Sequence, residues 1–86
     1  MIKFYVLEIQ KLESGYAHLV HTAEDEDANT ARMKGESVYH QVLAAAAVSN
    51  LAVHAAVLVS PEGFPVLHQC YKHNTPAAAQ EEAAEE

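Results

Sequence analysis

The stretch that decides the architecture of this chain runs from residue 51 to residue 59: Leu51-Ala52-Val53-His54-Ala55-Ala56-Val57-Leu58-Val59. Apolar side chains occupy both sets of alternate positions in it. A strand with one face in water alternates apolar and polar residues instead. The stretch therefore predicts a strand in a sheet that is covered on both of its faces.

Three further segments have strand character. Residues 2–11 are rich in β-branched and aromatic residues, and a turn at Glu13-Ser14-Gly15 leads to a second strand at 16–22, with Gly15 free to take a positive φ. The turn Ser60-Pro61-Glu62-Gly63 leads from 51–59 to a strand at 64–72. Pro65 cannot donate a ladder hydrogen bond, so it predicts an edge or a bulge there.

A helix is predicted between the two hairpins. From Ala28 to about Ser49, apolar and small residues recur with a 3.6-residue period. The acidic run 24–27 is predicted to begin this helix, with Asp27 or Asn29 as its cap. Gly35 lies on the apolar stripe, where a glycine costs helix stability, and this predicts that another backbone passes close by.

The elements together predict one α+β domain over residues 1–73 with the order ββαββ. Its sheet is expected to have four mainly antiparallel strands, with one long helix on one face. Residues 74–86 are rich in alanine and glutamate and contain no residue suited to a core. This composition predicts a disordered acidic tail.

Self-association is expected to cover the second face of the sheet. One helix covers only one face, and a chain of 86 residues with a single cysteine has neither a large core nor an internal disulfide. The predicted oligomer interface combines a tract of small helical residues with the central strand: Ala44, Ala45, Ala46, Ala47, Val53 and Val57.

Charge and cysteine usage narrow the partners and the location. The net charge is −7, but four acids lie at 24–27 and four more in the tail, which leaves four acids and five bases elsewhere. The chain therefore shows neither the acidic face of a DNA mimic nor the basic stripe of a protein that binds nucleic acid directly. The lone cysteine and the absence of a signal peptide or long apolar segment predict the cytoplasm and no membrane association.

The histidines and the cysteine suggest two kinds of site, and neither has a local motif. Three histidines on different predicted strands, at positions 18, 54 and 68, could assemble a metal site, but no spacing demands one. Same-face neighbours such as His68 and Cys70 lie about 6.5–7 Å apart, which is too far to activate a thiol. Cys70 is expected to be a small buried hydrophobe. The sequence thus predicts no catalytic residue, no metal, no cofactor and no enzymatic activity.

Planar polar side chains give a sharper hypothesis. Such side chains stack on a flat ligand and hydrogen bond to its edge, and the small residues nearby leave it room. A small planar, nucleotide-like ligand at a subunit seam is therefore predicted. The alternative is that these are half-buried sheet residues that satisfy backbone groups. The candidate residues are Tyr39, His40, Gln41, His54, His68, Gln69 and Tyr71.

The run Tyr39–Ser49, the segment His54-Ala55-Ala56-Val57-Leu58 and the tripeptide Gln69-Cys70-Tyr71 resemble small uncharacterised proteins encoded in prophages of gut bacteria. The resemblance implies a phage product that works in the bacterial cytoplasm or is carried on the virion. It suggests a counter-defence protein that sequesters a host nucleotide signal, or alternatively a structural or assembly component of the virion. A weaker alternative is an inhibitor that binds a host protein through residues 24–27.

Overall fold

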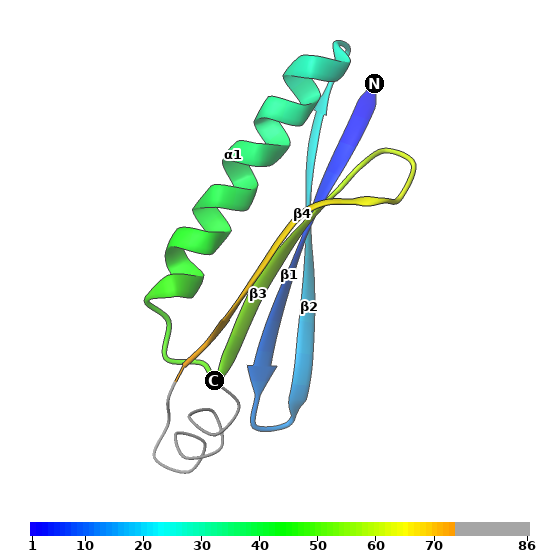
Figure 1. Cartoon of the computed structure of the whole chain (residues 1–86). Helices are drawn as coiled ribbons and strands as arrows, with labels where there is room; N and C mark the ends of the chain where they lie inside the picture. The colour runs from blue at the N-terminus through cyan, green and yellow to red at the C-terminus, as the bar shows by residue number, and fades with distance from the viewer. Residues whose placement is uncertain (74–86) are drawn as a thin grey trace.

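The computed structural model describes residues 1–73, and the predicted tail at 74–86 lies outside them. Strands β1 (Ile2–Leu12) and β2 (Gly15–Asp25) form the first hairpin, α1 (Ala28–Ala47) follows, and β3 (Val53–Val59) and β4 (Pro65–Lys72) form the second (Figure 1). The predicted α+β class and the order ββαββ are confirmed.

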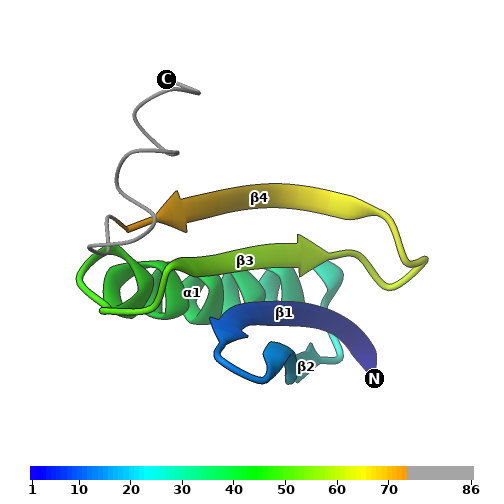
Figure 2. The same cartoon turned by 90° about the horizontal axis from the view of Figure 1, so that it is seen from below.

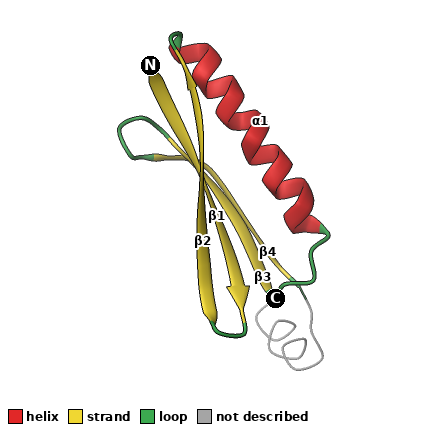
Figure 3. Ribbon diagram, turned by 180° about the vertical axis from the view of Figure 1, so that it is seen from behind, coloured by secondary structure: helices red, strands yellow, loops and turns green. Residues whose placement is uncertain are grey.

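All neighbouring strands pair antiparallel, in the order β2-β1-β3-β4. Helix α1 lies along one face of this sheet (Figures 2 and 3). It packs on β1, β2 and β3 and barely reaches β4, which is an edge strand. The helix therefore covers one face and leaves the β4 side of that face partly open.

The core lies between α1 and the two central strands. Phe4 and Val6 of β1 and Ala56 and Leu58 of β3 pack against buried residues of α1, among them Ala31, Tyr39 and Val42. Since successive residues of a strand point to opposite faces, the odd-numbered residues of β1 and β3 lie on the face away from α1. We call this second face, which no described residue covers, the open face.

Helix α1 begins where a side chain satisfies its first free N–H groups. Asp27 Oδ2 accepts hydrogen bonds from Thr30 N at 2.8 Å and from Thr30 Oγ1 at 2.9 Å, which confirms Asp27 as the cap. The prediction that the whole acidic run begins the helix is wrong, because Glu24 and Asp25 still belong to β2. They pair there with Lys3 and Ile2 of β1 and so prolong the first hairpin.

The turns follow the predicted chemistry. Gly15 has a φ of +130° and Gly63 a φ of +95°, conformations that side-chain-bearing residues rarely adopt. Ser60 N donates to the Phe64 carbonyl at 2.8 Å, which closes the second turn. Pro65 pairs with Val59 where the β3–β4 register shifts, so the predicted edge and irregularity are both present.

Gly35 lies at the closest approach between α1 and the sheet. A Cβ atom added to it would lie 3.0 Å from Leu58 Cδ1 and 3.1 Å from Phe4 Cβ. The predicted close approach is therefore present, but the neighbours are these two side chains. Phe4 Cβ is bonded directly to the backbone, so rotation of the Phe4 side chain cannot move this atom away from an added Cβ.

We expect Gly35→Ala to destabilise the fold although alanine favours a helix by about 1 kcal/mol over glycine. Overpacking against Phe4 and Leu58 should cost about 1–3 kcal/mol and outweigh that gain. Urea unfolding followed by circular dichroism measures the difference. Ser37→Ala, on the exposed side of the same helix, is the control and should leave stability unchanged or slightly raised. A Gly35→Ala variant more stable than the wild type would contradict the tight contact.

Candidate functional site

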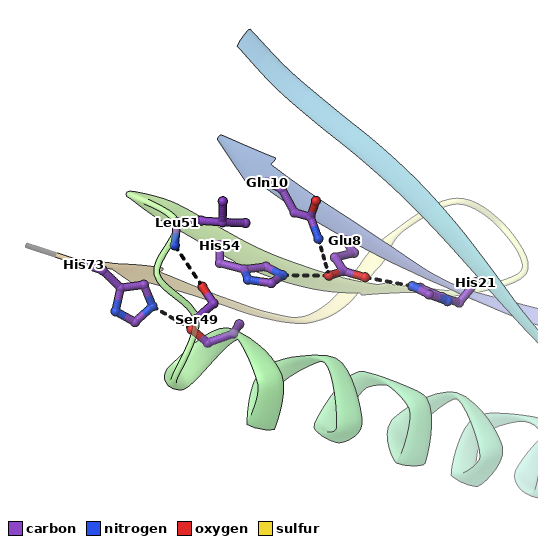
Figure 4. Close-up of polar contacts among 8 residues, drawn as sticks. Glu8, Gln10, His21, Ser49, Leu51, His54 and His73 are labelled. Atoms are coloured by element: carbon purple, nitrogen blue, oxygen red, sulfur yellow. Dashed lines mark hydrogen bonds and ion pairs between the residues drawn. The ribbon is translucent and has the colours of Figure 1, made fainter. Parts of the chain in front are cut away.

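A carboxylate lies on the helix-covered face of the sheet and receives three hydrogen bonds (Figure 4). His54 Nε2 of β3 lies 2.6 Å from Glu8 Oε2, and His21 Nε2 of β2 lies 3.0 Å from Glu8 Oε1. Gln10 Nε2 donates to Glu8 Oε2 at 2.9 Å. Three adjacent strands thus contribute to one polar cluster, which we call the Glu8 cluster: Glu8, Gln10, His21 and His54.

The cluster fixes the charge of Glu8 and the proton of His54. Burial alone would raise the pKa of Glu8, but the hydrogen bonds from His54, His21 and Gln10 outweigh burial and hold this pKa below its ordinary value of 4.5. Glu8 is therefore ionised near neutral pH and can only accept hydrogen bonds, so His54 Nε2 donates to it. In the neutral imidazole this leaves Nδ1 of His54 as an acceptor.

That Nδ1 atom has no partner. The His54 side chain is only 6% exposed, and within residues 1–73 its Nδ1 is the buried side-chain nitrogen or oxygen that makes no hydrogen bond. Buried polar groups are almost always paired, and an exception calls for a bound water, a ligand or a functional role. His54 is consequently the residue at which the described fold is chemically incomplete.

Aromatic rings lie beside His54, where α1 stops short of β4. Tyr71 is the register partner of His54. Burial first, and then the nearby Tyr71, raise the pKa of Tyr39 above its ordinary value. The ring of His40 meets that of Tyr39 edge to face at 5.3 Å, and His73 stacks on Tyr71 at 6.3 Å. His73 Nε2 also lies 2.6 Å from the Ala46 carbonyl, to which it donates.

Two residues of β4 on the helix side of the sheet, Leu67 and Gln69, remain exposed because α1 does not reach them. Together with the rings they form a surface that we call the α1–β4 flank. It consists of His40, Leu67, Gln69 and Tyr71, with Tyr39 and His54 buried next to it.

The structure brings together five of the seven predicted ligand residues. Tyr39, His40, His54, Gln69 and Tyr71 belong to the flank or border it. His68 lies on the open face, on the other side of the sheet from α1, and Gln41 is exposed on the helix.

The predicted interface residues divide between two surfaces. Val53 and Val57 lie on the open face, whereas Ala44, Ala45 and Ala47 are exposed on α1 and Ala46 is buried in the core. The helix and the open face lie on opposite sides of the sheet, so the two groups of residues belong to different surfaces of one copy. The prediction of a buried Cys70 is wrong, because Cys70 is exposed on an edge strand whose open face has no covering layer.

Sequence reasoning missed Glu8, Gln10 and His21. A signal was present, because Glu8 interrupts an otherwise apolar run in β1 at a position that faces the helix. The proposed trio of His18, His54 and His68 does not converge, since His54 lies on the helix side and the others lie on the open face. Across residues 1–73, no three His, Cys, Asp or Glu side chains are placed to hold a metal ion, and no helix is long and apolar enough to cross a membrane.

The lowered pKa of Glu8 predicts an acid-sensitive fold. The folded state holds this carboxylate ionised more strongly than the unfolded chain does. Its stabilisation is therefore complete above the ordinary pKa of 4.5 and is lost as the pH falls through the lower folded value. We expect Glu8→Gln to lose about 2 kcal/mol near neutral pH and to flatten the decline of stability below pH 4.5.

Urea unfolding between pH 7 and pH 2.5 measures this effect. Asp25 should retain part of the slope, because the N–H of Asp27 and then Lys34 lower its pKa as well. Glu62→Gln, at an exposed turn, is the matched control and should behave as the wild type. An unchanged acid slope in Glu8→Gln would show that the cluster does not control the pH response.

Comparison with known proteins does not assign this chain to a family. The chain matches no protein-family model, no curated protein and no solved structure. What the site can do chemically therefore rests on its own residues.

Proposed function

We propose that this chain is a non-enzymatic binding protein that holds a small planar, nucleotide-like ligand against the α1–β4 flank. The observation that carries this proposal is the buried, unpartnered Nδ1 of His54, which lies beside the half-buried ring of its register partner Tyr71. Nδ1 has almost no exposed area, so a ligand must displace neighbouring side chains to reach it. The hydrogen bond then removes the cost of an unpaired polar group, which is about 1–3 kcal/mol.

The flank favours a particular chemistry. In the neutral imidazole, Nδ1 is an acceptor when Nε2 donates to Glu8, and the matching ligand group is then an N–H donor such as the amine or imide of a nucleobase. The rings of Tyr71 and His40 offer faces for stacking, and the Gln69 amide offers both a donor and an acceptor. Small planar sites of this kind combine apolar area with a few well-placed polar groups.

Sequestration of a host nucleotide signal, in the cytoplasm of a bacterium that carries the phage genes, is the role we propose for this binding. It is supported by the resemblance to prophage proteins and by the chemistry of the flank. Nothing in the flank resembles a nucleophile paired with a base, which is why we propose retention of the ligand and not its conversion.

Ligand binding is tested by thermal unfolding in the presence of linear nucleotides and cyclic di- and trinucleotides. A ligand at about 100 times its dissociation constant stabilises the protein by about 2.7 kcal/mol, or roughly 10–20 °C for a domain of this size. We expect Gln69→Ala and Tyr71→Ala to reduce this shift. His68→Ala, one residue away on the opposite face of the sheet, is the matched control and should retain it.

Two results would reject the proposal. One is the absence of stabilisation by every nucleotide tested. The other is a shift that His68→Ala removes and Gln69→Ala leaves intact, because binding would then take place on the open face.

A second candidate, a structural or assembly component of the virion, is favoured by a different observation. The sheet has unpaired edges at β2 and β4 and a face that no described residue covers, so copies have several surfaces through which to pack. Mass spectrometry of purified virions tests this candidate, which requires the protein to be present in stoichiometric amounts.

A further inference from the structure

The open face has an apolar centre and charged ends. Its three middle rows across the sheet contain no Asp, Glu, Lys or Arg, whereas Lys3 and Glu24 lie at one end and Lys11 at the other. Apolar centres with polar rims are typical of stable protein interfaces. From β2 to β4 the rows are His18-Ile9-Ala55-Cys70, Val20-Leu7-Val57-His68 and Thr22-Tyr5-Val59.

The apolar centre of the open face is also uneven, because large and small side chains lie on neighbouring strands. On the open face β1 presents the large side chains of Tyr5, Leu7 and Ile9, which form a ridge. Their register partners on β3 are the smaller Val59, Val57 and Ala55, which form a trough. A shallow hollow of about 290 Å³ lies over this trough, and Ala55, Val57, His68 and Cys70 are among its lining residues. Ridge and trough thus run side by side at matching heights along the strands.

We propose that the open face is the interface of a homodimer in which the β1 ridge of each copy packs into the β3 trough of the other. A two-fold axis parallel to the strands produces this arrangement, because it reverses the order of strands across the sheet and keeps each row at its height. Ile9 then lies over the partner's Ala55 and fills the hollow. The same contact is made twice, as a two-fold interface requires.

The alternative two-fold axis, perpendicular to the strands, fits the relief poorly. It places β1 over the partner's β1, so ridge meets ridge and the two troughs face each other across a void. Unfilled volume at an apolar contact is costly, at about 24 cal/mol per Å³ in protein cores. Size matching therefore selects the parallel axis.

The available area suits a dimer. Strands about 4.8 Å apart, with a rise of about 3.3 Å per residue, give this four-stranded face a flat area on the order of 600 Å². Because side chains project from the sheet, the accessible area of this face is larger than its flat area. It approaches the roughly 800 Å² per partner of standard interfaces. The flank proposed for ligand binding lies on the other side of the sheet, so this inference is independent of the proposed function.

Sedimentation equilibrium tests the interface. We expect the wild type at tens of micromolar to have twice the 9.4 kDa of the chain. Leu7→Lys introduces an ammonium group at the centre of the face from each copy and should weaken the dimer by roughly 100-fold or more. Met33→Lys, the same kind of change on the exposed side of α1, is the control and should leave the dimer intact. Circular dichroism checks that both variants are folded.

Cross-linking tests the axis. The parallel axis places His18 of β2 opposite the partner's Cys70, about 10 Å away across stacked sheets, whereas within one chain three strand spacings, or about 14 Å, separate the two positions. We expect His18→Cys to form a covalent dimer with a bismaleimide linker of about 8 Å, and the wild type, with Cys70 alone, not to do so.

Each result decides. A monomeric wild type overturns the open face as a homodimer interface, and this is the result expected if a different protein covers that face. A dimer that survives Leu7→Lys overturns it as well. Loss of the dimer in Leu7→Lys without the His18→Cys cross-link overturns the ridge-in-trough arrangement. Nucleotide binding by a monomeric Leu7→Lys variant would leave the proposed function standing, so the two proposals fail separately.

Discussion

A single helix cannot cover both faces of a four-stranded sheet, and this constraint shapes the whole molecule. Helix α1 is held against β1 and β3 at Gly35, where the missing side chain lets Phe4 and Leu58 approach the helix backbone. The helix contacts β1, β2 and β3, runs short of β4 on its own face and leaves the other face without a covering layer. The α1–β4 flank and the open face thus both follow from having one helix on a four-stranded sheet.

Burying polar groups in such a thin core costs free energy unless they form hydrogen bonds with one another. The Glu8 cluster meets this condition by drawing partners from three strands, so that the carboxylate accepts a hydrogen bond from each of His54, His21 and Gln10. The network is complete at Glu8 and incomplete at His54. A satisfied carboxylate thus lies next to a buried nitrogen that lacks a hydrogen-bond partner.

Local chemistry made much of the fold predictable. Strand-forming segments, the Asp27 cap and the positive φ of Gly15 follow from rules that act over a few residues. The apolar residues on both faces of 51–59 predicted a central strand, but they did not identify which side chains face the helix. The boundary at residues 24–25 was mistaken because acidic residues favour helix starts, but here pairing with β1 prevailed. Cys70 was misplaced because exposure depends on where a strand lies in the sheet.

The site was less predictable, because contacts between distant strands create it. His54 and Glu8 lie 46 residues apart in the sequence, and no sequence motif predicts that their side chains are in contact. The short reach of α1 toward β4 likewise depends on packing between elements that are distant in the sequence.

The two exposed edges of the sheet differ in a way that matters at high concentration. Strand β4 begins at Pro65 beside a register shift, which hinders another strand from pairing there, whereas β2 offers an uninterrupted edge of 11 residues. Strand-to-strand aggregation of this protein would therefore begin at β2.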